Sequence, residues 1–200
     1  MVRIRSLLVP LIAGVLVLSA CGSGDDSTAV GEVGPEASAL ALTADGIGPY
    51  LIGQPFESVR SGLAGDIGGW DIDSDDRPDA VHVPTCTGEV TRLVGWGNLT
   101  LLFTGDQGSL TFATWTYGFD PLTGSAEDVR VLGLVTPEGI GLGSARSDIE
   151  RAYGDSASFS DATESVGTVV IMGEESVPHL QGRLEDDRLV LLERSPTCSV

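Results

Sequence analysis

A short pattern of residues occurs twice in this chain of 200 residues. The stretch 43–47, with the sequence TADGI, returns as TPEGI at 136–140. A glycine turn and the start of an amphipathic segment then follow at 53–60 in the first copy and at 143–150 in the second. Repetition of this kind is typical of folds assembled from similar supersecondary units. We therefore expect two tandem units in one chain.

Each copy predicts a short helix after its glycine turn. Pro55 and Ser144 stand where the two helices are expected to begin. Gly65 and Gly154 are expected to end them, because glycine readily adopts the left-handed conformation of a helix C-terminus. The apolar residues at helical spacing are Phe56, Val59 and Leu63 in the first copy and Ala145, Ile149, Ala152 and Tyr153 in the second.

Strands are predicted after each helix, where runs are rich in Val, Leu, Thr and aromatic residues. In the alternating run that contains them, Leu99, Leu101 and Phe103 share one face. The expected fold class is therefore α+β, with two tandem units, each a short helix packed on an antiparallel β-meander. The predicted strands span 89–96, 99–104 and 109–117 in the first half and 167–172, 179–184 and 188–194 in the second.

The N-terminal segment 1–20 has the composition of a secretory signal. Two arginines precede an apolar run at 7–18, and the small residues Ser19 and Ala20 come directly before Cys21. The run is shorter than the ~20 apolar residues that a membrane-spanning helix needs. We therefore expect cleavage before Cys21 and no remaining spanning helix.

The residues 18–21, Leu-Ser-Ala-Cys, resemble the lipobox of bacterial lipoproteins. The resemblance implies a thioether-linked diacylglycerol on Cys21 and an N-acyl chain such as palmitate. Two or more acyl chains hold a protein on a membrane far longer than one. The implied location is the cell membrane, lipid-anchored, on the extracytoplasmic side. The alternative is an ordinary secreted protein in which a cysteine lies near the signal-peptide cleavage site by chance and carries no lipid.

The glycine turn and helix of each copy are similar to a motif of BamE-type envelope lipoproteins and of the β-lactamase-inhibitor-protein fold, which uses two such units. Gln54 and Ser144 stand where those proteins often carry methionine. The chain also resembles uncharacterised lipoproteins of G+C-rich Gram-positive bacteria, in keeping with its use of arginine and no lysine. These resemblances imply a fold and a binding role, and no activity.

The formal net charge is −18. This negative charge excludes sequence-independent binding to nucleic acid, which relies on contacts between basic side chains and phosphate groups. It also disfavours adhesion to anionic lipid, so membrane attachment must depend on the acyl chains of Cys21. The segment 21–41 is rich in small and acidic residues and is expected to be a flexible tether. The expected units are then 42–134 and 135–200, sharing one core.

Cys86 and Cys198 remain once Cys21 carries lipid. Outside the cytoplasm two such thiols are expected to pair. In the loop-entropy model, closing so long a loop is worth about 4 kcal/mol. The alternatives are two buried free thiols, or a two-cysteine metal site that includes His82 or His179.

Asp71, Asp73 and Asp75 match positions one, three and five of a calcium loop. However, Asp76 and His82 stand where such a loop needs glycine and a bidentate glutamate. A solvated loop between strands is therefore the default interpretation of this run, and a cation-binding envelope protein is an alternative function.

Catalysis has little support in the sequence. Only His82 and His179 could serve as imidazole bases, and the nucleophile motif G-x-S-x-G does not occur. We expect a non-catalytic protein without a cofactor, and a hydrolase with an unrecognised site remains an alternative. The expected function is a binding or interaction module with a protein or cell-wall partner.

Aromatic residues offer a candidate binding face. A period of two places Trp115 and Tyr117 on the face opposite Leu110 and Phe112. One of these faces is expected to pack on a helix, and the other could be open to a partner. Core packing is nevertheless the favoured interpretation of Trp115 and Tyr117, and of their aromatic neighbours Trp70, Trp96 and Phe119.

Overall fold

The computed structural model describes residues 40–75, 90–106, 108–118, 130–161, 167–173 and 179–194. The predicted signal, the lipidated Cys21 and the disulfide between Cys86 and Cys198 lie outside these residues, as do His82 and Phe119. Within the described ranges, no helix combines the length and the apolar character needed to cross a membrane.

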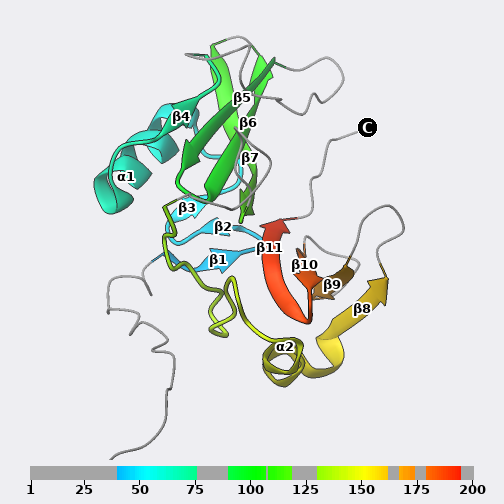
Figure 1. The fold of residues 1–200 in the computed structure, drawn as a ribbon. Helices are drawn as coiled ribbons and strands as arrows, with labels where there is room; N and C mark the ends of the chain where they lie inside the picture. Colours follow the sequence, from blue (N-terminus) through cyan, green and yellow to red (C-terminus); the bar gives the residue numbers. More distant parts are fainter. Residues whose placement is uncertain are drawn as a thin grey trace, which may run out of the picture. The chain divides into compact units, whose positions relative to one another are not determined.

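An eight-stranded antiparallel sheet organises the described residues, with its strands in the order β4-β5-β6-β7-β11-β10-β9-β8 (Figure 1). Strands β7 and β11 are distant in sequence and pair antiparallel, with Tyr117 opposite Leu192 and Thr116 opposite Glu193. The strands are β4 (Ile72–Asp73), β5 (Val90–Trp96), β6 (Leu99–Asp106), β7 (Ser109–Tyr117), β8 (Ala157–Asp161), β9 (Thr168–Met172), β10 (Leu180–Glu185) and β11 (Arg188–Arg194).

Two α-helices and a small second sheet accompany the large sheet. Helix α1 spans Phe56–Ile67, and α2 spans Arg146–Tyr153 and leads into a 3-10 turn, η2, at Gly154–Ser156. The small sheet consists of β1 (Leu42–Thr43), β2 (Gly46–Ile47) and β3 (Tyr50–Leu51). The predicted α+β class with antiparallel strands is confirmed.

The helix ends differ in how well the sequence predicted them. Helix α2 stops at Gly154 as expected, whereas α1 continues through Gly65 and stops at Gly68, whose φ is 91°. A glycine inside a helix costs only about 1 kcal/mol relative to alanine. The helix therefore ends at Gly68, which has a positive φ, rather than at Gly65.

Several short strands were not predicted. Strands β1 to β4 have two residues each, too few to show a period of two. Strand β8 has the sequence Ala-Ser-Phe-Ser-Asp, in which phenylalanine is the one large apolar residue. The six predicted strands are all present; two have the predicted bounds, and the ends of the other four differ by one or two residues.

The main hydrophobic core combines apolar residues of both helices with those of the large sheet. Val59, Leu63 and Ile149 of the helices are buried in it. Leu99, Leu101 and Phe103 are fully buried in the same cluster, so the period of two predicted for this strand is confirmed.

A bulge in β7 rules out the candidate binding face of Trp115 and Tyr117 and explains why both are core residues. The pairing of β6 with β7 shifts in register at Ala113, which has no partner across the strands. One extra residue in a strand reverses the alternation beyond it. Trp115 and Tyr117 therefore turn to the same face as Phe112 and are 0% and 1% exposed. The prediction that they could form an open binding face is wrong.

The two copies of the repeat make matching backbone contacts. In each copy the residues before the helix bond to the last strand of the same half, and that strand carries a bulge, at Ala113 in β7 and at Val190 in β11. The bonds are Gly53 N to Phe112 O and Phe112 N to Gln54 O in the first copy, and Gly143 N to Leu189 O and Leu189 N to Ser144 O in the second.

Candidate functional site

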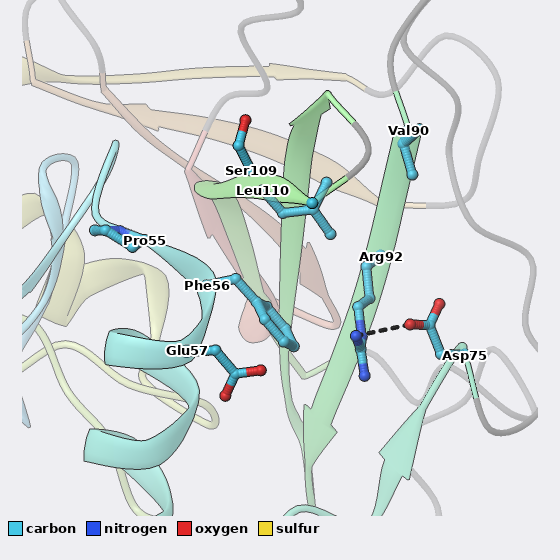
Figure 2. Close-up of a pocket in the computed structure, with 9 residues that line it drawn as sticks. Pro55, Phe56, Glu57, Asp75, Val90, Arg92, Ser109 and Leu110 are labelled. Atoms are coloured by element: carbon cyan, nitrogen blue, oxygen red, sulfur yellow. Dashed lines mark ion pairs between the residues drawn. The ribbon is translucent and has the colours of Figure 1, made fainter.

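A cavity of about 580 Å³ lies where the start of α1 faces strands β5 and β7 (Figure 2). Its apolar wall includes Phe56, Val90 and Leu110, and its polar wall includes Glu57, Asp75 and Arg92. Figure 2 shows Phe56 reaching from α1 toward the strands, while Arg92 extends toward Asp75.

The start of α1 is held against β7 by the backbone. Pro55 forms an isolated bridge with Thr111, and Phe112 N donates to Gln54 O at 2.9 Å. Proline also presets the backbone angle for entry into a helix. Glu57 lies in the first turn, where its negative charge is favoured by the helix dipole. Phe56 and Glu57 are thus presented to the cavity by backbone that is bonded in place.

A buried ion pair fixes the polar wall. Arg92 donates from Nε to Asp73 Oδ1 at 2.8 Å and from Nη2 to Asp73 Oδ2 at 2.7 Å, a bidentate arrangement. The Asp73 side chain is 1% exposed. Arg92 Nη1 also lies 2.7 Å from Asp75 Oδ2. The hydrogen bond to Asp73 raises the pKa of Arg92, which therefore stays charged.

Guanidinium groups and aromatic rings alternate beside this pair. The Arg92 guanidinium carbon lies 4.3 Å from the centre of the Phe56 ring, and that of Arg60 lies 4.9 Å from the same ring and 4.5 Å from the Trp70 ring. Phe56 also packs edge-on against Phe103, with ring centres 4.8 Å apart. Cation–π and edge-to-face contacts of this kind hold an aromatic ring in one orientation.

The three aspartates of the predicted calcium loop pair with arginines, and Asp73 and Asp75 share Arg92. Asp73 faces Arg92 and also Arg60, whose Nη1 lies 3.6 Å from Oδ2. Asp71 accepts hydrogen bonds from the backbone N of Gly97 and from Arg130 Nη2. In the described part of the chain, no three acidic, histidine or cysteine side chains are grouped to hold a metal ion. Asp71, Asp73 and Asp75 are therefore not grouped as ion ligands among the described residues, and the rest of the predicted loop, 76–82, lies outside them.

The other aromatic residues singled out in the sequence join elements of the fold. Trp96 Nε1 donates to Gly68 O and Trp115 Nε1 donates to Thr43 O, each at 3.1 Å. The Tyr117 hydroxyl accepts from Leu134 N at 3.0 Å. Trp70 is 38% exposed and lies next to Arg60. His179 directly precedes β10 and does not line the cavity.

The sequence interpretation missed Arg92, Glu57 and Phe56 as site residues. One signal was available for Arg92. It alternates with Val94 and Trp96, both of which are fully buried, so a charge stood in register with core positions. A charge at such a position requires an ionic partner. No comparable signal distinguished Glu57 from the other acidic residues.

Comparisons with protein-family models, with curated proteins and with solved structures find no match to this chain. The role of the cavity is therefore argued from its own geometry. The cavity is lined by apolar side chains and by exposed carboxylates, and its Phe56 ring is fixed by contacts with Phe103, Arg60 and Arg92.

Proposed function

We propose that this protein is a lipid-anchored envelope protein that acts as a non-catalytic binding module through the cavity beside α1. The observation that carries the proposal is the cavity of about 580 Å³, because its walls are held by the buried pair of Arg92 and Asp73. Ligand sites are typically concave and largely pre-formed, with a few placed polar groups on an apolar lining. The residues before Cys21 support the anchor.

We also propose that the domain consists of two tandem units, 42–134 and 135–200, each with a helix and an antiparallel meander. The matching backbone bonds and the bulges at Ala113 and Val190 support this arrangement. The pairing of Thr116 with Glu193 would then join equivalent positions of the two units at the centre of the sheet.

The proposed units differ where the cavity lies. Counting from the bridging residue before each helix, Arg146 in the second unit stands where Phe56 stands in the first. Arg146 packs over the Phe159 ring at 4.3 Å, so a guanidinium fills the place of the aromatic ring. This difference supports a binding role for the first unit alone.

The anchor is tested by mass spectrometry of the protein from membrane fractions. The expected result is an N-terminal peptide that begins at Cys21 and carries diacylglycerol. A Cys21→Ser variant should be found in the medium instead. An unmodified N-terminal peptide on membrane-bound protein would contradict the anchor.

The cavity is tested by a photoreactive side chain at Val90, which lies in its wall and is 47% exposed. The same probe at Val131, which is 68% exposed and does not line the cavity, is the matched control. We expect a discrete cross-linked species in cells from position 90 only. It should disappear when Ser109→Trp fills the cavity. Equal cross-linking from both positions would refute the proposal.

A further inference from the structure

The charges around the cavity favour a positively charged ligand. Glu57 and Asp75 border it with side chains that are 68% and 60% exposed. Behind them the buried Asp73 faces both Arg60 and Arg92. Carboxylates thus outnumber guanidinium groups in this cluster, and the formal charge of the whole chain is −18. A field of this sign raises the local concentration of cations.

The arginines of the cluster are already committed to carboxylates. The Arg92 guanidinium makes two hydrogen bonds to Asp73 and an ion pair with Asp75. Arg60 does not line the cavity; its Nη2 lies 2.9 Å from Glu57, and its buried Nε has no hydrogen-bond partner among the described residues. An anion would have to compete with a buried bidentate pair for the same donors. The exposed oxygens of Glu57 and Asp75, in contrast, retain free acceptor capacity.

The opposite wall favours an apolar body on that ligand. Phe56, Val90 and Leu110 face the same space, and Val90 leaves 47% of its surface exposed. Long basic side chains bury an apolar stem while the charged end stays in a polar environment. A bare metal ion would leave this apolar wall unused.

We propose that the cavity binds an organic cation, an ammonium or guanidinium group carried on an apolar chain, with the charge at Glu57 and Asp75 and the chain against Phe56, Val90 and Leu110. The inference rests on the proposed function, that this cavity is a binding site. The same chemistry is presented by a free alkyl cation and by an arginine or lysine next to an apolar residue in a polypeptide.

Isothermal titration calorimetry on the full chain in detergent micelles tests this, with blank micelles as the baseline. The probes are n-butylguanidinium, n-butylsulfonate and guanidinium without the chain. We expect saturable binding of n-butylguanidinium with a dissociation constant in about the millimolar range. Guanidinium alone should bind about tenfold or more weakly, because the buried CH₂ groups are lost. Equal binding of the sulfonate, or no saturation with n-butylguanidinium, would overturn the inference.

A matched pair of variants locates the contact. Asp75→Asn should weaken the binding of n-butylguanidinium about fivefold, the effect of one exposed ion pair. Asp155→Asn removes the same charge from an exposed residue outside the cavity and should leave binding unchanged. An equal loss in both variants would mean that only the overall charge of the protein acts, which contradicts a cation site. Circular dichroism confirms folding of both variants.

A peptide arm identifies the source of the cation. If acetyl-Leu-Arg-Leu-amide binds about tenfold more tightly than n-butylguanidinium, the natural ligand is a basic polypeptide segment; equal affinities indicate a free cation. The outcome is separable from the proposed function. Cross-linking from position 90 without a preference for cations would leave the cavity a binding site and refute only this inference. Loss of both results would refute the binding role itself.

Discussion

Replacement of Asp73 by asparagine tests whether the buried ion pair sets the structure of the site. Asp73 is 1% exposed and faces the guanidinium groups of Arg92 and Arg60. Removing one partner of a buried pair typically costs 3–5 kcal/mol, because it leaves an uncompensated charge. Asp75 and Glu57 still border the two arginines, which are themselves partly exposed. We therefore expect Asp73→Asn to lower the free energy of unfolding by about 3 kcal/mol.

The matched control is Asp71→Asn in the same segment. Asp71 is 58% exposed and pairs with Arg130, which is 46% exposed. An exposed pair of this kind is worth up to about 1 kcal/mol. Asparagine also retains an oxygen that can accept the hydrogen bond from Gly97. The control should therefore cost about 1 kcal/mol or less.

Urea denaturation at neutral pH is the assay, since urea does not screen charges as guanidinium chloride does. The double variant Asp73→Leu/Arg92→Met should recover most of the loss, because well-packed apolar residues can replace a buried pair at little cost. The reasoning is refuted if Asp73→Asn is no more destabilising than Asp71→Asn, or if the double variant is less stable than Asp73→Asn.

Three further predictions concern burial. Trp115→Ala should lower the free energy of unfolding in urea by about 3–5 kcal/mol, because it empties a fully buried site. Trp70→Ala loses only a partly exposed contact with Arg60 and should lower it by about 1 kcal/mol. Equal losses in the two variants would contradict the assignment of the bulge. Burial raises the pKa of Glu193, so Glu193→Gln should stabilise the protein at pH 7. In a series of unfolding measurements at decreasing pH, this gain in stability should vanish below about pH 4, where the carboxyl group is protonated in both states. A gain that does not change with pH would exclude the carboxyl group as its source. Burial and then the hydrogen bond to Asp66 raise the pKa of Tyr50 to about 12. The contribution of Tyr50 to folding stability is therefore complete below pH ~10 and is lost as the pH rises through 12. Tyr50→Phe should remove this component of alkaline unfolding, and an unchanged dependence of stability on pH in the alkaline range would contradict the prediction.

Local patterns predicted the regular elements because their causes are local. Leu99, Leu101 and Phe103 alternate along a strand, and a strand exposes alternate residues to one face whatever it pairs with. The C-terminal end of α2 was predicted for the same reason, since Gly154 has a positive φ that ends the helix through its own backbone. The residues before Cys21 likewise predict an anchor without reference to any fold.

Tertiary pairing decided which face of the second half of β7 is buried. The sequence of β7 contains no mark of the bulge at Ala113, because a bulge exists only relative to the strand it pairs with. That one residue places Trp115 and Tyr117 on the buried face of the sheet and not on the candidate binding face.

The sequence by itself determined the class of the fold, its helices and longer strands, and a strongly acidic chain with a predicted lipid anchor. Only the tertiary structure decided that Asp73 pairs with Arg92, since these residues belong to different strands and meet through the pairing of β4 with β5. The physical reason is the range of each interaction. Periodicity and capping act within a few residues, whereas the partner of a buried charge is chosen by the whole fold.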